Sequence, residues 1–289
     1  MKKVWLLFCG ALIFFQLHTA HALPSGDLLP LEPTALVLAV SGRVSITNEN
    51  RQTYDALPLH RLVPGHSIVL AKGARLSLMV RATGNRRVYQ GPARLLLKDQ
   101  FVSVRFGAQP TVQALTPLQH DIAEQWLVRY PRRGNQPEPR FLGLDVVSPK
   151  DGAMLLNRFP EFVFKGDLPR EGSLLIFDGQ GKRFWVQQLD DVRVHFPNSV
   201  EFGWGQNFTW EVRKLTGGRV LAGSFSIASE WTARNLLEAR VPNLPSTPRE
   251  DLAFYGMRLQ LACAYEEASR IWESLGIVLD STGRPRRLR

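Results

Sequence analysis

The stretch Leu62–Val80, LVPGHSIVLAKGARLSLMV, contains a clear strand pattern in the N-terminal part of this chain. Its second half, Arg75–Arg81, alternates polar and apolar residues. Because successive side chains of a strand point to opposite faces, this alternation places Leu76, Leu78 and Val80 on one face. The pattern predicts a half-buried antiparallel strand.

The same pattern extends in both directions from this stretch. Phe101–Phe106 also alternates and places Val102, Val104 and Phe106 on one side. Between the predicted strands stand turn-forming pairs, namely Ser41-Gly42, Pro64-Gly65, Lys72-Gly73, Gly84-Asn85 and Gly91-Pro92. Leu36–Phe106 is therefore predicted to form a compact β-roll or sandwich without βαβ units.

Four further segments complete the expected organisation. His120–Tyr130 is predicted to be a short helix that closes a first domain over residues 23–130. Residues 131–140, PRRGNQPEPR, form a semi-rigid linker. Residues 141–229 contain seven short predicted strands, the number expected of an immunoglobulin-like sandwich. They are Leu144–Val147, Glu161–Phe164, Ser173–Phe177, Phe184–Gln187, Arg193–Phe196, Thr209–Arg213 and Val220–Ile227.

The last segment, residues 230–289, has a helical pattern. Glu230–Arg240 is one predicted helix, and Pro248–Leu275 is predicted to break near Cys263–Tyr265 into a hairpin. A loose basic tail with four arginines ends the chain. The fold class predicted from the whole sequence is mainly β with a C-terminal α-helical hairpin.

Residues 1–22 have the three-part layout of a secretory signal peptide. Met1-Lys2-Lys3 is basic, Val4–Phe15 is an apolar run, and Ala20-His21-Ala22 offers a cleavage site. The run is shorter than a membrane-spanning helix needs, and an uncleaved anchor is the alternative. We therefore expect an exported protein, periplasmic or secreted. Cleavage leaves Cys263 as the only cysteine, either buried as a small apolar residue or paired between chains.

Several motifs of the first domain resemble the FecR-like domain of exported bacterial proteins. They lie in Val40–Ile46, Leu62–Val80 and Val88–Lys98, where glycines mark tight turns between short alternating strands. The resemblance implies a β-domain without catalytic residues. It implies an interaction role on the envelope side and not direct regulation of a sigma factor, since we expect no cytoplasmic segment before the apolar run.

Two later segments resemble other families. Ser148–Ile227 is similar to immunoglobulin-like and fibronectin type III domains, with Phe159–Phe164 at its start and Phe208–Val212 in its late strand. Leu252–Leu275 resembles part of a tetratricopeptide repeat, with Ala264–Ala268 at the turn into its second helix. One repeat cannot bury its own apolar face, so we expect it to pack on the sandwich or on a partner.

No catalytic or metal-binding pattern is found in the sequence. His60, His66, His120 and His195 have no second ligand at metal spacing, and His66 and His195 are expected to be ordinary surface or hydrogen-bonded residues. The adjacent carboxylates of Asp190-Asp191 and Glu266-Glu267 do not face each other in a strand or helix. We expect no cofactor and no enzyme activity, with a hydrolase of unrecognised type as the weakest alternative.

The tryptophans allow two interpretations. They can form a platform for a carbohydrate or peptide, or they can fill cores. Trp185 and Trp210 are expected in the sandwich core and Trp272 in the helical hairpin. Trp204, between two glycines, is the tryptophan that we expect to be exposed.

The net charge of +10 is concentrated in the first domain. The segment from Arg43 to Lys98 contains ten basic residues and only two acidic ones, Glu49 and Asp55. One interpretation is a solvated arginine-rich surface. The other is that Arg75, Arg81, Arg86 and Arg87 contact an anionic partner such as an acidic protein loop, a lipid headgroup or an anionic glycan.

The sequence thus predicts an envelope protein that acts as a protein-interaction or signalling accessory module. Its partner is expected to be an envelope or membrane protein and not nucleic acid. A module that binds peptidoglycan or another anionic glycan is the alternative. The pattern leaves the oligomeric state open.

Overall fold

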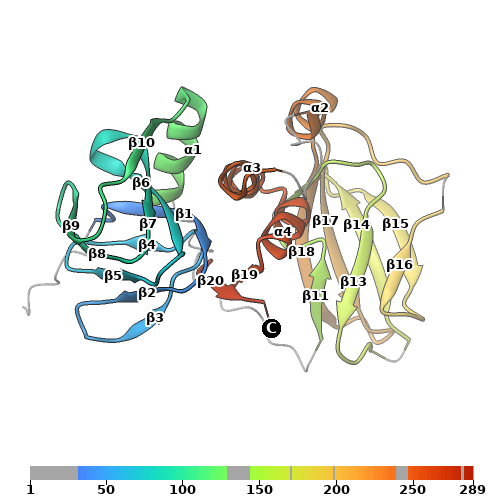
Figure 1. Ribbon diagram of the computed structural model, residues 1–289. Helices are drawn as coiled ribbons and strands as arrows, with labels where there is room; N and C mark the ends of the chain where they lie inside the picture. Colours follow the sequence, from blue (N-terminus) through green and yellow to red (C-terminus); the bar gives the residue numbers. More distant parts are fainter. Residues whose placement is uncertain are drawn as a thin grey trace, which may run out of the picture. The chain divides into compact units, whose positions relative to one another are not determined.

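The computed structural model describes residues 32–128, 144–169, 171–197, 199–238, 247–280 and 283–288. The predicted signal segment, the 131–140 linker and most of the connection before residue 248 lie outside the described residues. The described part is mainly β, with antiparallel sheets and a helical C-terminal part (Figure 1). The predicted fold class is confirmed at this level.

The first β-domain, residues 32–128, has two five-stranded antiparallel sheets with an apolar core between them. The first sheet has the order β10-β7-β6-β1-β4, and the second has the order β3-β2-β5-β8-β9. The strands of the first sheet are β10 (Thr111–Ala114), β7 (Asn85–Gln90), β6 (Arg75–Val80), β1 (Ala35–Ser41) and β4 (Arg61–Leu62). Those of the second are β3 (Thr53–Asp55), β2 (Val44–Thr47), β5 (Ser67–Leu70), β8 (Ala93–Leu97) and β9 (Val102–Phe106).

The prediction of half-buried strands is wrong for β6. Leu76, Leu78 and Val80 enter the core between the sheets as predicted, but Ser77 and Met79 on the opposite face are buried too. They are buried because helices cover the outer face of this sheet. In β9 the predicted face is only partly buried, since Val102 enters the core whereas Phe106 is 59% exposed at the sheet edge.

The sandwich domain, residues 144–227, has a three-stranded sheet and a five-stranded sheet around an aromatic core. The orders are β11-β13-β16 and β12-β18-β17-β14-β15. The strands are β11 (Asp145–Ser148), β12 (Ala153–Leu155), β13 (Glu161–Lys165), β14 (Ser173–Asp178), β15 (Arg183–Gln188), β16 (Arg193–His195), β17 (Asn207–Arg213) and β18 (Arg219–Ile227). The seven predicted strands are present, and β12 is an additional one that pairs in parallel with β18.

Aromatic rings fill the centre of the sandwich core. Phe162 is fully buried and packs edge-on against Trp210 and Phe225, with ring centroids 5.6 and 5.8 Å away. Edge-to-face contacts of this kind add to the stabilisation from burial alone. The core positions of Trp210 and Trp272 are confirmed, and Trp185 is half-buried at the margin of the aromatic core.

Four helices of the described residues share a second apolar core, which we call the helical core. They are α1 (Pro117–Val128), α2 (Glu230–Glu238), α3 (Arg249–Leu261) and α4 (Tyr265–Ser274). Leu36 and Leu38 of β1 and Met79 of β6 belong to the same core, so α1 and α3 cover the outer face of the first sheet.

The position of the C-terminal hairpin differs from the expectation. Helices α3 and α4 pack against each other as predicted, and α4 contacts β12 of the sandwich domain. However, α3 packs on β1 and α1 of the first β-domain. The helical core therefore joins residues from both β-domains, because the outer face of β1 is as apolar as its inner face.

The prediction of a loose basic tail is wrong for residues 285–287. Strand β20 (Pro285–Arg287) pairs with β19 (Ile277–Leu279) in an antiparallel hairpin. Asp280 fixes its turn by accepting hydrogen bonds from the backbone of Arg284 and from Nε of Arg286. Because β20 pairs with β19 and its turn is held by Asp280, residues 285–287 are ordered and not loose as the arginine-rich sequence predicted.

Cys263 stands at the break between α3 and α4. It is free and half-buried, and its φ of 62° is in the left-handed region that glycine prefers after a helix. Its carbonyl accepts a hydrogen bond from the backbone N–H of Met154, 2.9 Å away. The turn therefore links the helical hairpin to β12, and full burial of Cys263 is not observed.

Candidate functional site

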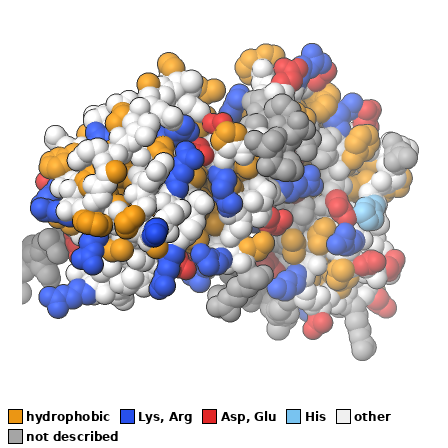
Figure 2. All heavy atoms as spheres, viewed as in Figure 1, with side chains coloured by type: hydrophobic (Ala, Val, Ile, Leu, Met, Phe, Trp, Pro, Cys, Tyr) orange, Lys and Arg blue, Asp and Glu red, His pale blue; other side chains and the backbone are white. Residues whose placement is uncertain are grey.

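The four predicted contact arginines do not form one surface. In β7, Arg86 lies opposite Met79 and Arg87 opposite Leu78, so these neighbours point to opposite faces of the sheet. Arg75 lies on the same face of the sheet as Arg86. Figure 2 shows basic side chains interspersed with hydrophobic and uncharged ones over the visible face. Strand parity thus separates Arg87 from Arg75 and Arg86, and contact of these arginines with an anionic partner stays a prediction.

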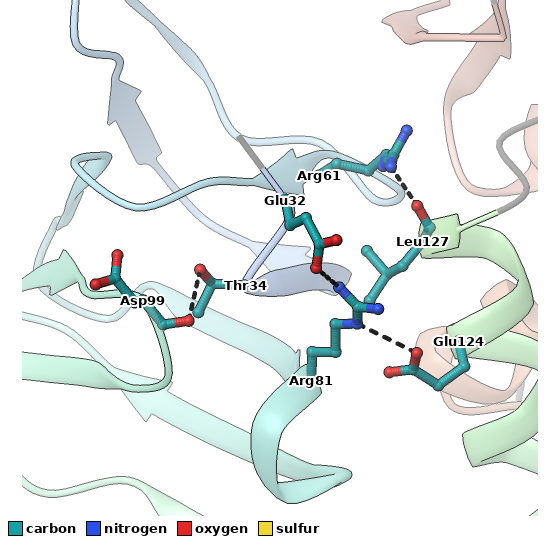
Figure 3. Close-up of polar contacts among 7 residues, drawn as sticks. All are labelled: Glu32, Thr34, Arg61, Arg81, Asp99, Glu124 and Leu127. Carbon is teal, nitrogen blue, oxygen red and sulfur yellow. Dashed lines mark hydrogen bonds and ion pairs between the residues drawn. The ribbon is translucent and has the colours of Figure 1, made fainter. Parts of the chain in front are cut away.

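The guanidinium group of Arg81 is paired with two carboxylates of this chain (Figure 3). Its Nη1 lies 2.7 Å from Oε2 of Glu32, and its Nε lies 3.3 Å from Oε2 of Glu124 in α1. These carboxylates raise the pKa of Arg81 and neutralise its charge locally. Arg81 therefore fastens the end of β6 to α1, and an external anion would have to displace two carboxylates.

Arg75 and Arg86 do share a cleft at the covered face of the first sheet. We define the cleft by Ser41, Arg75, Ser77 and Arg86 of the sheet, Gln119 of α1, and residues 247–251 at the start of α3. Its volume is 590 Å³. Two segments distant in the sequence thus form its walls, since α3 contacts β1 and α1.

The sheet wall of the cleft contains unpaired polar groups. Ser77 is 1% exposed, and its hydroxyl has no hydrogen-bond partner among the described residues. Arg86 donates from Nη2 to Oε1 of Gln113 in β10, while its shielded Nε has no partner in the same part of the chain. A buried polar group without a partner costs free energy, so these groups favour an occupant that can bond them.

The helix wall of the cleft carries carboxylates. Oε1 of the buried Glu250 lies 3.8 Å from Nη2 of Arg75, a loose ion pair. Oδ1 of Asp251 accepts a long hydrogen bond, 3.5 Å, from Nε2 of Gln119. Arg249 donates from Nη2 to the carbonyl of Leu275 and is thereby anchored at the end of α4. The cleft therefore has arginines and carboxylates on facing walls.

A second feature is an exposed tryptophan surface, defined by Trp204 and Trp231. Trp231, in the first turn of α2, is 76% exposed, and Trp204 is 37% exposed. Their segments lie together because the N–H of Gly205 donates to the carbonyl of Ala228, 3.0 Å away. The expectation that Trp204 is exposed is confirmed, and the structure adds Trp231 as a more exposed tryptophan.

Arg158 orders one side of the tryptophan surface. Its guanidinium carbon lies 5.8 Å from the centroid of the Trp204 ring, within cation–π range. Its Nε donates to the carbonyl of Phe202, 2.8 Å away, and its Nη1 pairs with Glu201 at 2.6 Å. Trp204 is thus held in a defined orientation, whereas Trp231 projects from the helix.

The histidines have structural positions. Burial lowers the pKa of His60 to about 4, and its Nδ1 accepts a hydrogen bond from the N–H of Leu57, 3.1 Å away. A hydrogen bond to the backbone of Pro285 connects His60 to the C-terminal hairpin and partly opposes this shift. Of the two positions expected for His66, the surface one is wrong because His66 is buried, and its Nδ1 has no hydrogen-bond partner among the described residues. Burial lowers the pKa of His66 as well. His195 is exposed in β16 as expected.

Sequence reasoning missed the cleft and Trp231 for different reasons. Nothing in the local pattern brings Glu250 and Asp251 to β6, because that contact depends on tertiary packing. Trp231 had a usable signal, since the buried residues of α2, Ala233 and Leu236, lie three positions apart and leave Trp231 off their stripe.

No group of three or more histidine, cysteine and acidic residues suited to a metal ion occurs in the described ranges. Among the same residues, no helix has the length and apolar composition needed to cross a bilayer. No protein-family model matches the chain, and no curated protein matches it.

Proposed function

We propose that this chain is an exported cell-envelope protein that acts as a non-catalytic protein-interaction or signalling accessory module. The observation that carries the proposal is the 76% exposure of Trp231, on a segment that is hydrogen-bonded to that of Trp204 through Gly205 and Ala228. Tryptophan is enriched at protein interfaces and among the residues that dominate binding energy. Two tryptophans on neighbouring segments are therefore the surface residues that we expect a partner to cover.

The export part of the proposal rests on residues 1–22 and their resemblance to a signal peptide. The similarity of the two β-domains to FecR-like and immunoglobulin-like domains supports a role in the envelope, and two successive sandwich-like units are consistent with it. We expect the purified exported protein to begin at Leu23. Retention of residues 1–22 together with a cytoplasmic location would contradict export.

A site-specific crosslinking experiment tests the interaction role. A photoreactive phenylalanine analogue replaces Trp231 in the full chain, and intact cells are irradiated. Leu215 is the matched control, because it is 75% exposed and lies in the turn between β17 and β18, outside the tryptophan surface. We expect a discrete protein adduct from position 231 and none from position 215. Equal adducts from both positions, or none from either, contradict the proposal.

The glycan alternative predicts a different result in a second measurement. An aromatic ring can also stack on a sugar face, so Trp231 could serve either class of partner. If the protein cosediments with isolated cell-wall sacculi and Trp231→Ala does not, the partner is a glycan and not a protein. Absence of cosedimentation, together with the crosslink at position 231, supports the protein partner.

A further inference from the structure

The cleft has walls of opposite chemical character. Arg86 and Ser77 on the sheet offer hydrogen-bond donors to an anionic group. Glu250 and Asp251 on the first turn of α3 offer acceptors to a cationic group. These sets come from β6, β7 and α3, so the arrangement belongs to the tertiary structure and not to one element.

We propose that the cleft binds a zwitterionic ligand, a free amino acid or a dipeptide, in which a carboxylate and an ammonium group lie close together. The carboxylate bonds Arg86 and the hydroxyl of Ser77, and the ammonium group bonds Glu250 or Asp251. A volume of 590 Å³ has room for a ligand of this size. This inference does not rest on the proposed function, since the tryptophan surface does not contribute to the cleft.

Ligands with a single kind of charge fit the cleft less well. A phosphate or sulfate at Arg86 faces the carboxylates of Glu250 and Asp251 across the cleft and is repelled by them. A polyamine at those carboxylates meets Arg75, Arg86 and Arg249. A zwitterion satisfies both walls and leaves the net charge of the site unchanged.

Binding requires a movement of Arg86. The hydroxyl of Ser77 and Nε of Arg86 are shielded from solvent, and Nη2 of Arg86 is held by Gln113. Gln113 lies in β10, an edge strand whose four residues are all exposed. Release of Arg86 from Gln113 therefore opens the floor of the cleft at the cost of one surface hydrogen bond.

The test is calorimetric titration of the purified protein with four probes. Alanyl-alanine and alanine carry both charges, N-acetylalanine carries only the carboxylate, and alanine amide carries only the ammonium group. We expect at least one zwitterion to bind about tenfold more tightly than both single-charge probes, the ratio that one lost charged hydrogen bond produces. Equal affinity of N-acetylalanine and the zwitterions would overturn the proposed ligand class.

Variants locate the binding to the cleft. Arg86→Gln and Ser77→Ala are each expected to weaken binding about five- to tenfold. Because the hydroxyl of Ser77 has no partner in the described part of the chain, Ser77→Ala leaves thermal stability unchanged or higher, which separates lost binding from lost folding. Arg87→Gln is the matched control, since it removes the same charge from the opposite face of β7.

Gln113→Ala gives a result that a purely structural role of Arg86 would not produce. It frees Arg86 and is expected to tighten zwitterion binding about two- to fivefold. Absence of binding to all four probes at about 10 mM overturns the proposal, because that concentration detects affinities weaker than most specific sites. Binding that is equal in the unaltered protein, Arg86→Gln and Ser77→Ala overturns it as well.

Discussion

Gly256, in the middle of α3, should resist a substitution that ordinarily stabilises helices. Replacing an internal helix glycine by alanine gains about 1 kcal/mol in helix propensity. A Cβ at Gly256, however, would lie 2.4 Å from Cη2 and 2.5 Å from Cζ3 of Trp272 in α4. Trp272 is 2% exposed and packs against Trp126, with ring centroids 6.0 Å apart, so its ring has little room to retreat.

The overpacking cost should therefore exceed the gain in helix propensity. Overpacking a well-filled core costs about 1–3 kcal/mol. We expect Gly256→Ala to lower the free energy of unfolding by about 1–2 kcal/mol net and the Tm by about 2–8 °C. Urea unfolding followed by circular dichroism measures the first quantity, and calorimetry measures the second.

Two further variants test whether the contact with Trp272 causes the loss of stability. The clashing atoms, Cη2 and Cζ3, are outer atoms of the Trp272 indole that the shorter phenylalanine side chain does not have. Gly256→Ala in a Trp272→Phe background should therefore be neutral or stabilising by up to about 1 kcal/mol. Gly218→Ala, at a surface position with no atom within 4 Å, should change stability by less than about 0.5 kcal/mol. An equal loss in both backgrounds, or a more stable Gly256→Ala protein, would refute the packing argument.

Four other outcomes are expected. Because burial lowers the pKa of His60 to about 4 from its ordinary value near 6.5, the folded state disfavours protonation of its imidazole. The free energy of unfolding is therefore at its full value above about pH 6.5 and falls by about 2–3 kcal/mol between pH 6.5 and 4. Urea unfolding across this range should detect the loss, and His60→Gln should abolish it. Cys263→Gly should raise the Tm, since glycine relieves about 1 kcal/mol at φ 62°; an unchanged or lower Tm contradicts this. Phe162→Ala, at the centre of the aromatic core, should cost about 3–5 kcal/mol in the same unfolding assay, and a cost below 1 kcal/mol would mean that the sandwich repacks. Arg81→Gln should cost about 1 kcal/mol and leave zwitterion affinity unaltered in calorimetry, whereas weakened affinity would place Arg81 in the binding site.

The strands were predictable because their signals are local. Alternation in β6 and β9, and glycines at the turns, depend on neighbours within a few residues. The break between α3 and α4 was equally local, since Cys263 takes the left-handed conformation that ends a helix. β12 was missed because three residues after a turn are too few for a period-two pattern.

The cleft was not predictable because both of its walls depend on tertiary contacts. A serine such as Ser77 in an alternating strand predicts solvent exposure, yet α1 and α3 cover that face. Arg81 and Arg86 look equivalent in the sequence, but one pairs with Glu124 and the other opens onto the cleft. Counting charges identified a basic segment, but it could not show which arginines lie on which face of the sheet, because that depends on the register of β6 and β7.

The helical core has a consequence for synthesis of the chain. Leu38 leaves the ribosome early, yet Leu252, which shares its core, emerges only near the end. The outer face of the first sheet therefore stays uncovered until α3 is available to pack on it, and the first β-domain cannot complete its burial before the end of the chain has been made. A chain that stops before α3 should therefore be prone to aggregation, so the last seventh of the sequence, from Arg249 onward, is needed to complete the fold of a segment near its beginning.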